Sequence, residues 1–131
     1  MATALTVHDE GTSGGRSRSF KLYLASARIT VRELIERRVT QEVEEYNRAQ
    51  PEYFQGLVQP TDAELVLNGY RLREKRLLDA SEQRAKAIEA FGRAGFFLLV
   101  DDRQVDTLED EIAVRPDTEV RFVKLVPLVG G

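Results

Sequence analysis

VRFVKLVPLVGG, residues 120–131, is the stretch that governs how the rest of this chain is interpreted. Its first half is rich in β-branched and aromatic residues, which predicts a strand running off the body of the protein. Glycine has no Cβ, so Gly130 and Gly131 would make a thin, pliable end that can thread a narrow channel and present the Gly131 carboxylate to a nucleotide or a cysteine. A frayed terminus is the alternative reading. The choice between a reactive end and a frayed terminus depends on the residues that precede the stretch.

The composition indicates one domain with a proper core. The chain has 131 residues, of which 42% are apolar and 31% charged. Its net charge of −3 lacks the positive surplus that nucleic-acid binders use against phosphate, so no nucleic-acid partner is expected. No apolar run is long enough to span a bilayer and no signal-peptide pattern follows Met1, so no membrane partner is expected either.

Cysteine is absent and His8 is the only histidine. These two facts exclude disulfides, thiolate nucleophiles and cysteine metal sites, and no protein-built metal site is expected. Nothing is spaced to assist His8 in catalysis, so we expect it to be a strand or surface residue. The lack of cysteine fits a cytoplasmic location.

Two polar–apolar alternations open the chain and predict a hairpin. They cover residues 3–9 and 20–24, and the second places Phe20, Leu22 and Leu24 on one face. The glycine-rich connection between them has neither the Gly-Lys-Ser/Thr ending of a P-loop nor dinucleotide-binding spacing, so we interpret it as a turn.

A helix is predicted from Thr30, which is placed to cap it with Glu33 in capping-box register, to a point before Pro51. Its apolar stripe comprises Val31, Leu34, Ile35, Val39, Val43 and Tyr46. Its charged residues Arg32, Glu36, Arg37, Glu42 and Glu45 are expected to form a solvated face.

The middle of the chain is punctuated by proline and glycine but is too apolar for a linker. Residues 51–79 are therefore expected to pack, with a short strand or turn at 63–69. A second helix is predicted from Ser81 to a stop at Gly95. Its buried side is expected to carry Ala85, Ile88 and Phe91.

The last third predicts strands. The apolar run 96–100 is expected to be a strand buried on both faces, or at least one in the middle of a sheet. A turn at Asp101 and Asp102 and a short return strand at Gln104 and Val105 are expected to follow it. A short helical turn is predicted at 107–112 and the final strand at 118–126. This order of elements indicates an α+β protein.

At this point the pattern resembles the ubiquitin-like β-grasp family. The hairpin is followed by ITVRELI (29–35), which resembles the entry into that family's central helix. LLVDDRQV (98–105) resembles its short third and fourth strands, and TLED (107–110) its Thr-Leu-x-Asp turn. TEVRFVKL (118–125) resembles its last strand, and the Gly-Gly end completes the order. The resemblance covers roughly residues 3–39 and 96–131.

The resemblance implies a mixed sheet packed on a central helix, in a single domain spanning residues 1–131. Residues 40–95 have no counterpart in ubiquitin and resemble a partly helical insertion, and residues 126–131 resemble a flexible tail. As a whole the chain is most similar to bacterial ubiquitin-like modifiers encoded beside their own activating, conjugating and deconjugating enzymes. That likeness suggests antiviral defence as the setting.

The tail departs from eukaryotic modifiers, which place arginines before the glycines. Here Pro127 and Val129 flank Leu128, so recognition by a eukaryotic activating enzyme is not expected. The proline keeps the tail extended, because its ring fixes φ. A Pro-x-x-Gly-Gly ending is closer to the sulfur carriers of the same fold, which are usually much smaller.

The resemblance implies a substrate of other enzymes, not an enzyme. Gly130 and Gly131 would be the conjugation residues, and Pro127, Leu128 and Val129 would be recognised by the partner enzymes: an activating enzyme, a conjugating enzyme and a deconjugating peptidase. ATP and magnesium would be used on the activating partner, with no cofactor on this chain. The amide would form on target proteins. Val123 and Leu125 are candidates for an exposed recognition patch.

Two other functions stay open from the sequence. A sulfur carrier would end in a thiocarboxylate at Gly131, and a β-grasp interaction module would leave the Gly-Gly unused. Removing Gly131 separates the interaction module from the other two, because only that module should keep its function.

Overall fold

The computed structural model describes residues 3–11, 18–67 and 69–125. Two helices and nine strands lie within these ranges, in the order β1 (Thr3–Gly11), β2 (Arg18–Leu24), β3 (Arg28–Thr30), α1 (Val31–Ala49), β4 (Ala63–Val66), β5 (Gly69–Leu72), α2 (Ala80–Gly92), β6 (Phe96–Val100), β7 (Arg103–Val105), β8 (Glu111–Ala113) and β9 (Glu119–Lys124). The α+β class predicted from the sequence is confirmed.

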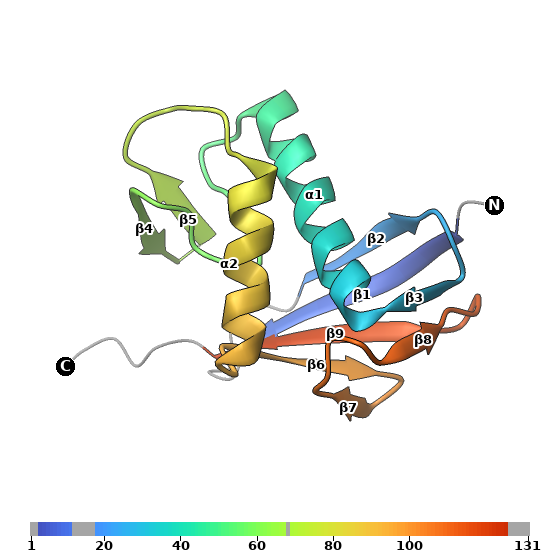
Figure 1. Cartoon of the computed structure of the whole chain (residues 1–131). Helices are drawn as coiled ribbons and strands as arrows, with labels where there is room; N and C mark the ends of the chain where they lie inside the picture. The colour runs from blue at the N-terminus through green and yellow to red at the C-terminus, as the bar shows by residue number, and fades with distance from the viewer. Residues whose placement is uncertain (1–2, 12–17, 68, 126–131) are drawn as a thin grey trace.

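Five strands form a mixed sheet in the order β2-β1-β9-β6-β7 (Figure 1). The opening hairpin is present, with β1 and β2 antiparallel. β9 lies at the centre, parallel to β1 and antiparallel to β6. The first and last strands of the described chain are therefore neighbours in the middle of the sheet.

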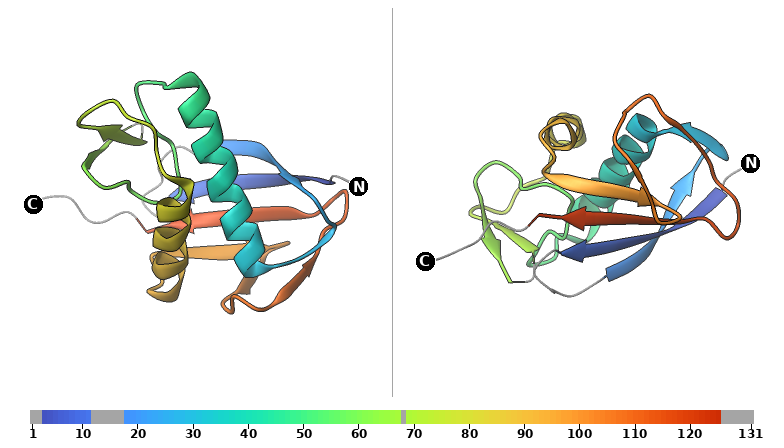
Figure 2. Two further views of the ribbon diagram at one scale, coloured as in Figure 1. Left: turned by 45° about the horizontal axis from the view of Figure 1, so that its top comes forward. Right: turned by 90° about the horizontal axis from the view of Figure 1, so that it is seen from below.

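Both helices lie on one face of this sheet, with α1 crossing the strands (Figure 2). All six residues of the predicted apolar stripe of α1 are buried. They pack on inward side chains of the central strands, among them Leu5, Val7, Val120 and Phe122, each at most 1% exposed. The alternation of these strands fixes the register, because a slip by one residue would turn every apolar side chain to the other face.

The ends of α1 agree with the sequence prediction. The Thr30 hydroxyl accepts a hydrogen bond from the Glu33 backbone N–H at 3.1 Å, so it caps the first turn. At the other end Gln50 adopts a left-handed conformation with φ 43° and donates its N–H to the Tyr46 carbonyl. Pro51 follows, and the helix cannot continue.

Residues 50–95, called here the α1–β6 segment, pack against the rest of the molecule as predicted. Phe54, Leu57 and Leu78 are buried in the same core as α1. β4 and β5 form a hairpin, and Phe54 extends it by bridging to Tyr70. The stretch 63–69 thus contains a strand, as one of the two predicted alternatives.

The predicted buried side of the second helix is partly wrong. Ala85 is exposed, whereas Gln83, Ala87 and Ala90 are buried, and Ile88 and Phe91 are half-buried against the core. Alanines lie on several faces of α2, and so short a side chain does not mark the buried one. The helix is capped by Asp79 and begins one residue before Ser81.

The predicted stop at Gly95 is one residue off. The left-handed residue is Ala94, with φ 57°. Gly95 donates its N–H to the Ala90 carbonyl at 2.7 Å, and Ala94 donates to the Phe91 carbonyl at 3.1 Å. This pair of bonds is the Schellman arrangement, with alanine where glycine is usual.

The predicted helical turn at 107–112 is also wrong. A single turn at Leu108 and Glu109 is followed by β8, which pairs antiparallel with β3. The carbonyls of Leu108 and Asp110 accept hydrogen bonds from the N–H groups of Arg32 and Val31, both at 2.9 Å, at the start of α1. The i, i+4 spacing of Leu108 and Ile112 imitates a helix, but the tertiary pairing decides the structure.

Among the described residues, neither helix combines the length and the apolar character needed to cross a membrane.

Candidate functional site

The residues predicted for conjugation and for tail recognition, Pro127, Leu128, Val129, Gly130 and Gly131, lie outside the described residues. The last described residues, Val123 to Leu125, form the root from which the C-terminal stretch continues. The candidate site is therefore built from this root and its surroundings.

The two residues predicted for a recognition patch differ in exposure. Leu125 is 41% exposed, and Val123 is half-buried on the face of the sheet that points away from α1. Phe97 pairs with Val123 and Leu99 with Arg121 across β6 and β9, so Phe97 and Leu99 share that outer face and are half-buried. We call Phe97, Leu99, Val123 and Leu125 the outer-face patch.

The sequence did not reveal Phe97 and Leu99 as members of this patch. They belong to a continuous apolar run, and such a run predicts burial without telling which face is open. A polar border lies next to the patch, where Arg121 Nη1 pairs with Glu10 Oε1 at 2.6 Å. An apolar strip with a charged border is typical of a protein-binding surface.

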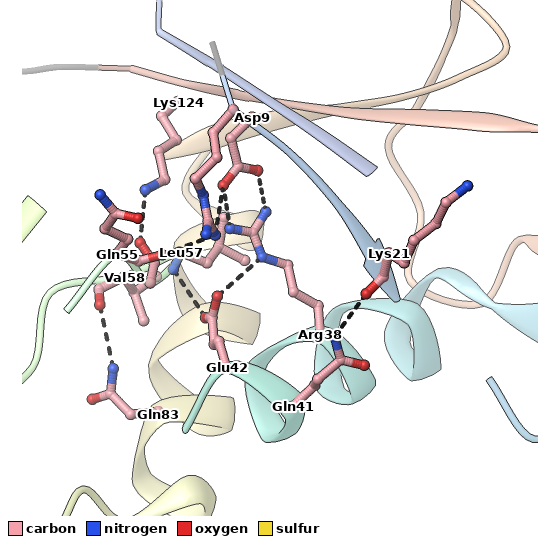
Figure 3. Close-up of polar contacts among 12 residues, drawn as sticks. Asp9, Lys21, Arg38, Gln41, Glu42, Gln55, Leu57, Val58, Gln83 and Lys124 are labelled. Atoms are coloured by element: carbon pink, nitrogen blue, oxygen red, sulfur yellow. Dashed lines mark hydrogen bonds and ion pairs between the residues drawn. The ribbon is translucent and has the colours of Figure 1, made fainter. Parts of the chain in front are cut away.

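The root is held by two parts of the α1–β6 segment. Lys124 Nζ donates a hydrogen bond to the Gly56 carbonyl at 2.7 Å (Figure 3). It also lies 5.7 Å from the centre of the Tyr70 ring. The Leu125 N–H donates to the Gly95 carbonyl at 3.3 Å. Gly56 lies near the beginning of that segment and Gly95 is its last residue, and both contact the chain where β9 ends.

Next to the root lies a buried ionic cluster. Arg38 on α1, with no exposed side-chain surface, forms a bidentate salt bridge to Asp9 on β1 at 2.5 and 2.6 Å. Its Nε also donates to Glu42 at 3.3 Å. The guanidinium lies 4.5 Å from the ring centre of Phe122 and 5.1 Å from that of Phe20, which gives it cation–π contacts in addition to ion pairs.

Glu42 connects this cluster to the α1–β6 segment. Its Oε1 accepts a hydrogen bond from the Leu57 N–H at 2.9 Å, and its side chain is only 11% exposed. The prediction that Glu42 lies on a solvated face is therefore wrong. Neither Arg38 nor Asp9 was predicted to be buried. Charged residues are almost never fully buried without a partner, and the sequence does not show that two residues 29 positions apart are partners.

Three cationic side chains surround two carboxylates near the root. The cations are Arg18, Arg38 and Lys124, and the carboxylates are Asp9 and Glu42. Arg18 also pairs with Asp9 at 3.7 Å. Burial, and then the charge of Arg38, lower the pKa of Lys124 from 10.5 to about 8. Burial raises the pKa of Glu42, against the attraction of Arg38. The Lys124 ammonium is thus kept in a place that disfavours its charge.

The exposed edge of the sheet at β2 is covered by side chains of α1. Gln41 donates to the Lys21 carbonyl at 2.8 Å and accepts from the Tyr23 N–H at 3.1 Å. Arg37 Nε donates to the Tyr23 carbonyl at 2.9 Å. These bonds occupy the positions that a further strand would use, so they protect the edge against pairing.

The single histidine lies in β1, as predicted. His8 Nδ1 is 2.6 Å from the Ser19 hydroxyl, and Nε2 is 3.5 Å from Glu119. Within the described ranges, no three His, Asp or Glu side chains are grouped so that they could hold a metal ion.

Comparison with known proteins found no match for this chain among protein-family models, among curated proteins or among solved structures.

Proposed function

We propose that this protein is a ubiquitin-like modifier, attached through the Gly131 carboxylate to amines of target proteins. Its partners would be an activating enzyme, a conjugating enzyme and a deconjugating peptidase, in a bacterial cytoplasm. ATP and magnesium would be used on the activating enzyme, and this chain would be the substrate, not the catalyst. Antiviral defence is the process we propose for it.

The fold supports this proposal through its strand arrangement. An opening hairpin, a helix crossing the sheet, and a last strand parallel to the first at the centre are all features expected of a β-grasp domain. A β-grasp fold alone hosts several functions, so the assignment depends on the terminus.

The observation that carries the proposal is the placement of the root. The central strand β9 ends at Lys124, and Pro127 to Gly131 follow within seven residues. The Lys124 and Leu125 contacts hold this point of the chain to the body of the molecule. A partner enzyme could then bind the outer-face patch beside this fixed point and the Gly131 carboxylate at the same time.

The chemistry of attachment starts from a carboxylate, which is a poor acylating agent. A Gly131 carboxylate oxygen would attack the α-phosphorus of ATP, forming an acyl-adenylate and releasing pyrophosphate. A cysteine thiolate of the partner would displace AMP to give a thioester, and a target amine would displace the thiolate to give an amide. Gly130 and Gly131 matter because they leave room around the reacting carbon.

A sulfur carrier is the second candidate, and the Pro127-x-x-Gly130-Gly131 ending favours it. After adenylation, sulfur would replace the adenylate and leave a thiocarboxylate. A third candidate is a β-grasp interaction module that binds partners through the outer-face patch, and the 41% exposure of Leu125 favours it.

Mass spectrometry of the protein recovered from its own cells tests all three. Trypsin cleavage after Lys124 would leave Leu125 to Gly131 as a branch on target lysines if the protein is a modifier. A free tail with one carboxyl oxygen replaced by sulfur would establish a carrier. An unmodified carboxylate under every growth condition would contradict both, and a variant lacking Gly131 would then retain function.

A further inference from the structure

Lys124, at the root, has an unusually buried position for a lysine. Lys124 is the last residue of the central strand, yet its ammonium reaches across to a backbone carbonyl of the α1–β6 segment, at Gly56. Burial and then the charge of Arg38 disfavour the protonated amine, whereas Asp9 and Glu42 favour it. A largely buried cation that donates to one specific carbonyl at the end of the central strand is a candidate for a role beyond stability.

The acceptor of this hydrogen bond is held in place by tight packing. A Cβ on Gly56 would lie 2.2 Å from two carbon atoms of the Phe54 ring, so only glycine fits. The Phe54 ring packs edge-on against Tyr46 of α1, with centroids 5.3 Å apart. Leu57, the next residue, is tied to Glu42 of the same helix. The Gly56 carbonyl is thus fixed to α1 through Phe54, two residues before it, and through Leu57, directly after it.

A second contact comes from the other end of the segment. The Gly95 carbonyl accepts the Leu125 N–H, and Gly95 is itself bonded to Ala90 at the end of α2. The root is therefore held between two points, one fixed to α1 and one fixed to α2. Both points belong to residues 50–95.

We propose that Lys124 is a positioning residue, which couples the root of the C-terminal stretch to the α1–β6 segment and so fixes the root where the activating enzyme binds it. This inference rests on the proposed function. The segment then contributes specificity, because a partner that receives the Gly131 carboxylate must also fit a root held by residues 50–95.

The charged and titratable groups around the Lys124 ammonium come from four elements. They are Asp9 on β1, Arg18 on β2, Arg38 and Glu42 on α1, and Tyr70 on β5. Since burial disfavours the charged amine, a substitution that removes the ammonium relieves this cost while it removes the link to Gly56. Loss of coupling and loss of stability can therefore be separated.

The first test uses the protein alone. In Lys124→Met, which keeps the apolar stem, we expect the backbone order parameter of Leu125 measured by NMR to fall from the range of rigid backbone, about 0.85, to below about 0.6. Lys75→Met, which removes an exposed lysine of the α1–β6 segment, should leave it unchanged. Equal order parameters in wild type and Lys124→Met would overturn the coupling.

The second test measures conjugates in the cells that make the protein. We expect Lys124→Met to reduce the yield of conjugates at least fivefold, and Lys124→Arg, which retains a charged donor, to restore part of it. All variants are scored on intact conjugates, because trypsin does not cut at position 124 of the Met variant and that variant cannot release the Leu125–Gly131 branch. Equal yields in wild type and Lys124→Met would overturn the positioning role alone. Absence of branches in the wild type would overturn the proposed function and this role together, and the NMR result would still decide the coupling.

Discussion

Arg38 and Asp9 form a bidentate salt bridge between α1 and β1 in which no part of the arginine side chain is exposed. Removing the Asp9 carboxylate leaves the buried guanidinium with only its longer hydrogen bond to Glu42, at 3.3 Å, so its charge is no longer fully compensated. We expect Asp9→Asn to lower the free energy of unfolding by about 3 kcal/mol, measured by urea denaturation.

The matched controls use the same measurement. Adding both Arg38→Met and Glu42→Gln to Asp9→Asn should recover more than half of the loss, because neither an uncompensated cation nor an unpaired Glu42 carboxylate then remains buried. Glu64→Gln, at the exposed pair with Arg71, should leave the midpoint unchanged. A triple variant as unstable as Asp9→Asn would contradict this account of the cluster.

The pKa of Lys124 gives stability a pH dependence of known sign. Below pH 8 the amine is protonated in the folded and the unfolded chain alike. Between about 8 and 10.5 the unfolded chain binds more protons, so the contribution of Lys124 to the free energy of unfolding rises with pH. The rise is at most roughly 3 kcal/mol, reduced by solvent screening of a partly exposed group.

Chemical denaturation of wild type and Lys124→Met from pH 7 to pH 10.5 checks this rise. The difference between the two curves should grow in favour of the wild type through that window. Lys75→Met should run parallel to the wild type. Parallel curves for Lys124→Met would mean that the lysine has an ordinary pKa.

Ala94 occupies a left-handed position that glycine adopts without strain. We expect Ala94→Gly to raise the free energy of unfolding by about 1 kcal/mol. Gly95→Ala should lower it, because the new Cβ would lie 3.2 Å from the Ala90 carbonyl oxygen. Thermal unfolding of the two variants checks both signs. A destabilised Ala94→Gly would refute the assignment of the strain to Ala94.

Gln41 protects the β2 edge by taking the place of a neighbouring strand. We expect Gln41→Ala to expose the Lys21 carbonyl and the Tyr23 N–H, and to promote association through that edge. Sedimentation velocity at increasing concentration should show dimers of this variant where the wild type stays monomeric. Glu45→Ala, one turn further along the same helix at an exposed position, is the control. A monomeric Gln41→Ala would show that the edge has another protection.

The parts of the fold that the sequence predicted are those with a local signal. Strand alternation gave the hairpin, the helical period gave the stripe of α1, and Thr30 marked its start. β3 and β8, the buried face of α2 and the burial of Glu42 depend on partners far along the chain, so no local pattern predicts them. The same holds for the site: Val123 and Leu125 were candidates, whereas Phe97, Gly56 and Gly95 join them only through tertiary pairing.

The adjacency of β1 and β9 has a consequence for biosynthesis. Thr6 lies beside Glu119 at the centre of the sheet, so β1 can pair with β9 only after residues 119–124 have been synthesised. A chain interrupted before residue 119 lacks its central strand and cannot close the core. Under the function proposed above, an enzyme that requires the folded body would reject such interrupted chains, so the sheet order would prevent their conjugation.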